Sequence, residues 1–183
     1  MKLDVIESGD NGEGPWYADG LNFTCTQCGN CCTGGPGFVW ISREEIVRLA
    51  GYLKISPEET VEKYCRKVDG QWSLKEFRNA AGNYDCVFLK EDQVSVPGAG
   101  GKNAVMATRR RCTIYDVRPL QCRTWPFWPE NLWERKTWDH AARRCHGMNA
   151  GHRHFTRERI EALRDAKDWP ENPPTSGQGP RAR

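Results

Sequence analysis

Apolar residues recur along the chain with two different spacings, and the changes between them divide it into predicted helices and strands. The first helix is expected to begin after Ser42. Ser42 and Glu45 match a capping box, in which each side chain accepts a hydrogen bond from the other residue's backbone N–H. The pattern extends this helix to about Leu53. A second helix is expected after Ser56, with Pro57 at its first position, where the missing N–H does no harm.

A row of apolar residues runs along the second predicted helix and continues beyond it. Its members share the spacing of one helix face and are Val61, Tyr64, Cys65 and Val68. A thiol in such a row is more often packed in a core than bound to a metal. Cys65 is therefore expected to be a buried core residue.

The next part of the chain reads as β-structure. Strands are expected over 72–77, 84–89 and 104–114, with a glycine-rich turn at 97–101. The simplest arrangement is a hairpin that is symmetrical about Ala99. Cys86 and Cys112 would then lie opposite each other, because their numbers average to 99 and paired Cβ atoms are about 5 Å apart. A slip of one residue would turn one of the two sulfurs to the other face.

Two more helices are expected in the C-terminal part. Pro119 can begin a short one, and Pro126 must end it by forcing Trp125 out of helical geometry. Cys122 therefore lies within a single short turn. A closing helix from Thr156 to about Trp169 would offer Ile160 and Leu163 to the core.

These elements predict one small α+β domain with short helices, a β-hairpin and an irregular cysteine-rich loop. The domain is expected to span 21–169, with flexible segments at 1–20 and 170–183. A chain of 183 residues, 38% of them hydrophobic, can build one core. Its net charge of +3 is too small to indicate a nucleic-acid partner.

The chain also lacks the marks of a membrane or secreted protein. No segment approaches the roughly 18 apolar residues of a membrane span, and the acidic N-terminus lacks the apolar stretch of a signal peptide. A cytoplasmic location is therefore expected. In that reducing compartment, clustered cysteines indicate metal binding or catalysis rather than the alternative, a disulfide framework.

Four of the nine cysteines fall within eight residues. They are Cys25, Cys28, Cys31 and Cys32. Two residues between cysteines let a tight turn bring both sulfurs onto one ion or cluster. Cys32 directly follows Cys31, and neighbouring side chains diverge. We therefore expect Cys32 to face a second centre or the far side of a larger cluster.

Further candidate site residues follow later in the chain. Arg118 and Arg123 flank Cys122, and cationic neighbours lower the pKa of a thiol and offset the charge of bound thiolates. We expect both arginines beside the bound metal or cluster, the alternative being ordinary surface residues. Cys145, the last cysteine, is expected to close the site.

Together these residues resemble the YkgJ-like cysteine-cluster family, whose Cys-x-x-Cys-x-x-Cys-Cys domain is described as zinc- or iron-chelating. The resemblance covers about 23–151 and also rests on 84–89, 112–115, 118–119, 122–123, 126–127 and Cys145. It implies eight ligands: Cys25, Cys28, Cys31, Cys32, Cys86, Cys112, Cys122 and Cys145. It leaves Cys65 outside the pattern. The segment after Cys145 is looser than the compact glycine-rich turn of the family.

The resemblance and the spacing leave three hypotheses for function. The first is an iron–sulfur protein, with one or more [4Fe–4S] clusters, in electron transfer or redox chemistry. The second is a zinc-stabilised protein-interaction module. The third is a metal-dependent protein-modifying enzyme, because a lysine N-methylase acting on flagellin carries the same motif. Such an enzyme could use His140, His146, His152 or His154 in place of a cysteine ligand or to transfer protons, although no S-adenosylmethionine site is recognisable in the sequence.

A segment rich in tryptophan and proline, 125–138, follows Cys122. It is expected to form a dry wall around the metal, and apolar walls restrict access of solvent and oxidants. The alternative is a docking surface for a protein partner, since aromatic residues are enriched at interfaces.

Overall fold

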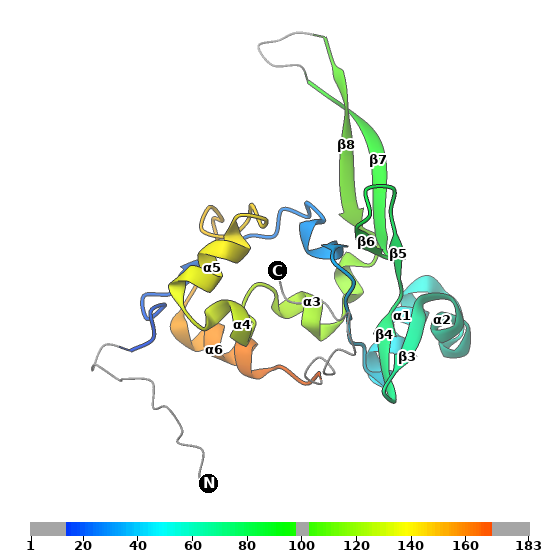
Figure 1. The fold of residues 1–183 in the computed structure, drawn as a ribbon, viewed down its shortest axis with the longest axis horizontal. Helices are drawn as coiled ribbons and strands as arrows, with labels where there is room; N and C mark the ends of the chain where they lie inside the picture. The colour runs from blue at the N-terminus through cyan, green and yellow to red at the C-terminus, as the bar shows by residue number, and fades with distance from the viewer. Residues whose placement is uncertain (1–13, 98–102, 170–183) are drawn as a thin grey trace.

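The computed structural model describes residues 14–97 and 103–169. Short helices and short antiparallel strands alternate in it, so the predicted α+β class is confirmed (Figure 1). Residues 1–13 of the first segment predicted to be flexible and all of the second, 170–183, lie outside the described residues. Residues 98–102, which include most of the predicted turn, lie outside them as well. Residues 14–20 of the segment predicted to be flexible are described, and Tyr17 is buried in the core.

Both predicted N-terminal helices are present. Helix α1 spans Arg43–Leu53 and begins with the expected capping box of Ser42 and Glu45. Helix α2 spans Pro57–Tyr64, with the Ser56 side chain accepting a hydrogen bond from the Glu59 backbone N–H. These starts were predictable because a cap depends only on neighbouring residues.

The apolar row after α2 is not helical beyond Tyr64. Cys65 begins strand β3 (Cys65–Val68), which pairs with β4 (Gln71–Leu74). Asp69 and Gly70 join the two strands with positive φ angles, a conformation that suits a two-residue hairpin turn. The helical assignment of Cys65 was therefore wrong. Its predicted burial is confirmed, since its side chain is packed in the core.

The long hairpin exists, but its register differs from the prediction. Strand β7 (Leu89–Val96) pairs with β8 (Val105–Cys112), and Cys112 lies opposite Leu89. Cys86 belongs to the separate strand β6 and pairs with Glu76, so the predicted pairing of Cys86 with Cys112 was wrong. A turn at Val87 and Phe88 separates β6 from β7 and places Phe88 in the core. The hairpin is therefore centred between one and two residues later than predicted, and Phe88 packs in the second core cluster.

Several short elements surround the cysteine residues. A three-stranded sheet consists of β2 (Thr33–Gly34), β6 (Tyr84–Cys86) and β5 (Glu76–Arg78), while β1 (Leu21–Asn22) pairs with β9 (His154–Phe155). Two 3-10 turns span Asn30–Cys32 and Tyr115–Val117. The expected short helix is α3 (Leu120–Thr124), between Pro119 and Trp125.

Three further helices complete the fold. They are α4 (Pro129–Leu132), α5 (Arg135–Ala142) and α6 (Arg157–Asp165). Helix α6 begins after Thr156 as predicted and ends before the predicted Trp169. No helix in the described residues is both long enough and apolar enough to cross a membrane.

The hydrophobic core consists of two clusters. The first gathers the aromatic residues of the N-terminal segment and of α4 to α6, including Phe127 and Trp138. The second lies under α1 and the β3–β4 pair and includes Leu49 and Ile114. Figure 1 shows these parts at opposite ends of the body, with α3 between them and the β7–β8 hairpin projecting away. The protein therefore has two small cores, and contacts at their junction must hold the two ends of the body together.

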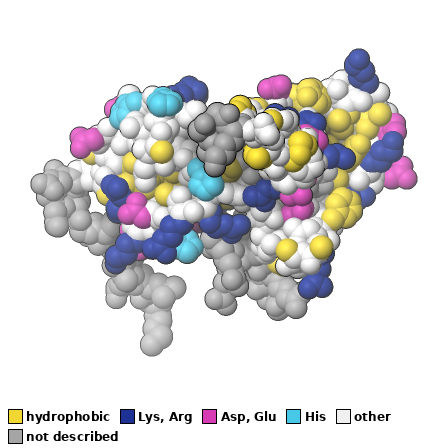
Figure 2. Space-filling model, turned by 90° about the horizontal axis from the view of Figure 1, so that it is seen from above, with side chains coloured by type: hydrophobic (Ala, Val, Ile, Leu, Met, Phe, Trp, Pro, Cys, Tyr) yellow, Lys and Arg dark blue, Asp and Glu magenta, His cyan; other side chains and the backbone are white. Residues whose placement is uncertain are grey.

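The two ends of the body also differ at the surface. Seen from above, the half that contains α4 to α6 carries the histidines and a row of Lys and Arg side chains (Figure 2). Hydrophobic side chains are more prominent on the other half (Figure 2).

Candidate metal centre

One cavity unites the predicted ligand cysteines. Its volume is about 50 Å³, and we call it the cysteine cavity. All eight cysteines implied by the family resemblance line it: Cys25, Cys28, Cys31, Cys32, Cys86, Cys112, Cys122 and Cys145. Cys65 is not among its lining residues and packs in the second core cluster instead. All nine cysteines are free thiols.

Five separate segments deliver these eight thiols. The loop 25–32 supplies four, and strand β6, the end of β8, helix α3 and the segment after α5 supply one each. Cys25 and Cys145 pack against the first core cluster, whereas Cys86 and Cys112 pack against the second. The cysteine cavity therefore lies where the two cores meet.

The side chains of the neighbouring residues Cys31 and Cys32 were predicted to diverge, but they do not. Their sulfurs are 3.7 Å apart, within the 3-10 turn that follows Gly29. Gly29 has φ +73, a conformation that glycine adopts without strain, and this geometry starts the turn. Both sulfurs face the same cavity, so Cys32 does not point to a separate site.

The thiols differ strongly in acidity. Burial raises the pKa of Cys86 to about 12, and it raises the pKa of Cys122 well above the usual range. In contrast, the hydrogen bond from Cys32 lowers the pKa of Cys31 to about 7, with the charge of Arg118 adding to the effect. Cys31 is also the exposed member of the set. Cys86 and Cys122 thus resist ionisation, whereas Cys31 ionises more readily than its neighbour Cys32, whose pKa is raised.

A buried indole group supports the fit to a bound metal. The Nε1 atom of Trp125 is buried and has no hydrogen-bond partner of its own among the described residues. Trp125 lines the cysteine cavity, and so does Cys145. A metal-bound thiolate at Cys145 would be a strong acceptor for this indole N–H, because a charged acceptor strengthens a hydrogen bond. The residues therefore fit thiolate ligation.

The thiols are spread around the cavity rather than gathered at one point. In the described ranges 14–97 and 103–169, no three Cys, His, Asp or Glu side chains are arranged to hold a single ion. The eight sulfurs surround a shared space instead.

The structure brings one of the two candidate arginines to the cavity. Arg118 lines it, lies 3.6 Å from the centre of the Tyr115 ring, and lowers the pKa of Cys31 through its charge. Arg123 is not among the lining residues. Its Nε donates to the Arg118 carbonyl oxygen, and its Nη2 lies 3.4 Å from Glu45. Arg118 therefore lines the cysteine cavity, whereas Arg123 lies beside α1, and a role of either arginine at a bound metal stays a prediction.

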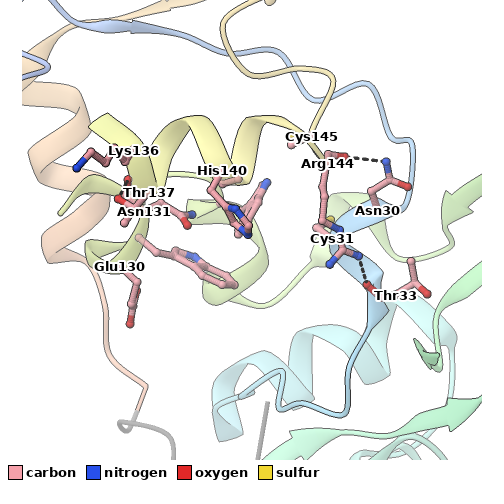
Figure 3. A pocket seen from close by; sticks show the side chains of 13 residues that line it. Asn30, Cys31, Thr33, Glu130, Asn131, Lys136, Thr137, His140, Arg144 and Cys145 are labelled. Atoms are coloured by element: carbon pink, nitrogen blue, oxygen red, sulfur yellow. Dashed lines mark hydrogen bonds between the residues drawn. The ribbon is translucent and has the colours of Figure 1, made fainter. Parts of the chain in front are cut away.

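One histidine lies near the cysteines. His140 lines a second cavity, of about 370 Å³, together with Cys31 and Cys145 (Figure 3). The other three histidines do not line any of the cavities next to the thiols. They are His146, His152 and His154, and all three are exposed. The predicted replacement of a cysteine by histidine has only His140 as a candidate in this structure.

The Trp and Pro segment 125–138 has mixed roles. Phe127 and Trp138 are buried in the core, whereas Trp125 forms part of the cysteine cavity wall. The Trp133 side chain is 82% exposed. The expected wall therefore consists of Trp125, and the partner surface stays a prediction.

Glu45 plays a part that sequence reasoning missed. Its carboxylate accepts a hydrogen bond of 2.7 Å from the Leu120 backbone N–H, which anchors the first turn of α3 to α1. Helix α3 carries Cys122, so this contact positions a cavity thiol. The capping box had already accounted for Glu45, and no local signal pointed to a partner 75 residues away.

The glycines after Cys145 have a steric role. A Cβ atom on Gly147 would lie 2.0 Å from the Thr24 carbonyl oxygen, and one on Gly151 would lie 2.2 Å from the Thr24 backbone N. The two segments also share a hydrogen bond from the Thr24 N–H to the Gly147 carbonyl oxygen. The chain after Cys145 thus packs directly against the residue before Cys25.

We expect Gly147→Ala to destabilise the protein by about 2 kcal/mol and to reduce its bound metal. The added methyl group would push the backbone of Thr24 aside, and overpacking a buried position costs about 1–3 kcal/mol. The matched control is Gly35→Ala, since a Cβ at Gly35 meets no atom within 4 Å. Thermal unfolding and metal analysis of both variants test the claim. Equal behaviour of the two variants would contradict it.

Comparisons with known proteins agree with this site. The CxxCxxCC family model, described as "Putative zinc- or iron-chelating domain", matches residues 24–146. The chain is also 29% identical over 111 residues to an uncharacterized protein of Methanocaldococcus jannaschii. That match covers 61% of this chain and 48% of the relative, so the chain spans about half the length of that protein. No solved structure matches the chain. Because the family model spans more than half of the chain and all eight cavity cysteines, the protein belongs to the CxxCxxCC family.

Proposed function

We propose that the cysteine cavity holds an iron–sulfur centre through which the protein exchanges electrons. The observation that carries this proposal is that eight thiols from five segments line one cavity. The zinc- or iron-chelating description of the family supports metal binding at these residues. The choice of iron–sulfur over zinc rests on the arrangement of the thiols.

The spread of the sulfurs favours a cluster over a single ion. A tetrahedral zinc site requires four ligands around one point, and no three donors in the described part of the chain are arranged in that way. In an iron–sulfur cluster the cysteines bind several iron atoms that are held apart by inorganic sulfide. Thiols distributed around a shared space suit that chemistry.

The surroundings of the thiols suit electron exchange. Cys122 and Cys86 are half-buried, and Phe23, Ile114 and Trp125 line the same cavity and limit solvent access. Cys31 lies at the surface, so one edge of a bound centre would be near an external electron donor or acceptor. Burial, sulfur hydrogen bonds and solvent exposure set the potential of such centres.

Anaerobic purification followed by metal, sulfide and absorption analysis tests this proposal. We expect iron, acid-labile sulfide, and broad visible absorption that decreases when dithionite is added, because reduction changes the electronic transitions of the cluster. A colourless protein with stoichiometric zinc and no sulfide would contradict it. Reconstitution of chelator-treated protein with iron and sulfide, or with zinc alone, shows which loading restores thermal stability.

One observation favours zinc as a second candidate. The 3.7 Å separation of the Cys31 and Cys32 sulfurs is close to the roughly 3.8 Å between ligands of a tetrahedral zinc with bonds of about 2.3 Å. Zinc at this pair would make the domain a metal-stabilised interaction module, with the exposed Trp133 as a candidate contact. The same metal analysis distinguishes the two candidates.

A further inference from the structure

We propose that a pocket next to the cysteine cavity binds a small organic oxyanion, a carboxylate or a phosphate. The pocket has a volume of about 310 Å³. Four arginines line it, and we call it the arginine pocket: Arg118, Arg123, Arg153 and Arg159. None of its lining residues is Asp or Glu.

The four arginines come from distant parts of the chain. Arg118 precedes α3 and Arg123 lies within it, whereas Arg153 precedes β9 and Arg159 lies in α6. Tertiary folding therefore places four positive charges around one space. Like charges at close range repel each other, and exposure to solvent reduces this repulsion without removing it. A bound anion would offset it.

Carboxylates of the protein do not provide that compensation. Arg123 lies 3.4 Å from Glu45, but Glu45 also contacts Arg48 and accepts the Leu120 N–H. Within the described residues, Arg118, Arg153 and Arg159 have no carboxylate within ion-pair distance. Three guanidinium groups thus remain available for an external anion.

The cysteine thiols account for only part of this positive charge. Arg118 lines the cysteine cavity as well as the arginine pocket. Arg118 can therefore offset the charge of bound thiolates. Arg153 is stacked 4.8 Å from the centre of the Phe155 ring, on the side of the first core. Its position suits a ligand in the pocket better than it suits the thiols.

The lining indicates the class of ligand. Guanidinium groups bind carboxylate and phosphate oxygens through paired hydrogen bonds. Phe23, Phe127 and Phe155 also line the pocket and offer apolar contact to a carbon body. A volume of about 310 Å³ is at the lower end of the roughly 300–1,000 Å³ of small-molecule sites. We therefore infer a small molecule that carries both an oxyanion and an apolar group.

The pocket shares a wall with the candidate metal centre. Cys25, Cys31 and Cys122 line both the arginine pocket and the cysteine cavity. A bound anion would therefore lie next to the thiols, and if the proposed centre is present its absorption should respond to the anion. Only this last expectation rests on the proposed function.

Calorimetric titration of the purified, metal-loaded protein tests the pocket. Benzoate and phenyl phosphate are suitable probes, because each joins an oxyanion to an apolar ring. We expect saturable binding of at least one probe, weakened by added salt. The double variant Arg153→Gln/Arg159→Gln should bind about 100-fold more weakly, since a charge-assisted hydrogen bond is worth about 1.5–3 kcal/mol and each 1.4 kcal/mol is a factor of ten.

The control removes the same amount of charge elsewhere. Arg135 and Arg157 are exposed, pair with Asp139 and Glu161 on their own helices, and do not line the pocket. Arg135→Gln/Arg157→Gln should therefore leave probe affinity unchanged. Equal losses in both double variants would overturn the proposal, because they would show a general charge effect. Binding of neither probe to the unmodified protein would also overturn it.

Two readouts separate this proposal from the proposed function. Binding of phenyl phosphate alone identifies a phosphate-bearing ligand, and binding of benzoate alone identifies a carboxylate. The metal content of Arg153→Gln/Arg159→Gln should equal that of the unmodified protein, since neither side chain lines the cysteine cavity. Probe binding by a protein that contains zinc would overturn the iron–sulfur assignment and leave the arginine pocket standing.

Discussion

Replacing Cys28 with serine is expected to lower metal affinity by about 100-fold or more, while replacing Cys65 with serine leaves it nearly unchanged. Cys28 lines the cysteine cavity, whereas Cys65 is packed in the second core cluster. Even residues that only orient a metal ligand change affinity by about 10–100-fold, so loss of a ligand should have an effect at least as large.

Metal content per protein after anaerobic purification, followed by competition with a chelator, measures this difference. Cys65→Ser is a demanding control, because it buries a hydroxyl group in the core and costs about 1–3 kcal/mol of stability. It should therefore lower the thermal midpoint while the metal stays bound. Equal metal loss in the two variants would show that the cavity thiols are not the binding site.

Removal of the metal is expected to unfold part of the protein and to leave both hydrophobic cores intact. The loop 25–37 has no buried apolar side chain, since Gly29 is its one buried residue. The thiols of this loop lie where the two cores meet, so a bound metal would link the two cores. Without that link, the loop has little to hold it in place, and binding free energy contributes directly to its order.

Hydrogen exchange with and without chelator measures this effect segment by segment. Exchange should accelerate by at least about tenfold in 25–37, and less in 112–127, where Ile114 and Phe127 are buried. Helices α1 and α6 should keep their protection, because their apolar faces pack in separate cores. Uniform loss of protection would show that the whole fold depends on the metal. Unchanged protection in 25–37 would show that the metal does not organise the loop.

Local chemistry explains the elements that were predicted correctly. The starts of α1, α2 and α6 follow from capping residues, and proline sets both ends of α3. Each of these features depends on residues within one or two turns. The membership of the cavity was also predictable, because the spacing in 25–32 and the family resemblance both identified the cysteines that line it.

The wrong predictions concern segments whose structure depends on contacts with residues far away in the sequence. The helical spacing of Cys65 was outweighed by pairing of β3 with β4, which the turn at Asp69 and Gly70 makes possible. The centre of the long hairpin was misplaced, because Val87 and Phe88 form a turn between β6 and β7 and Phe88 packs in the second core cluster. In both cases the local pattern had two readings, and contacts from elsewhere in the chain selected one.

The sequence by itself determined the α+β class and the helix starts, because caps and proline act over short distances. Its spacing also identified four of the cavity cysteines, and the family resemblance implied the full set of eight without Cys65. Only the tertiary structure decided that all eight thiols share one cavity between two cores, that Arg118 lines it without Arg123, and that four arginines form a pocket beside it. These arrangements join residues up to about 120 positions apart. They result from packing of apolar side chains in each core, and such packing leaves no periodic signal in the positions of polar residues.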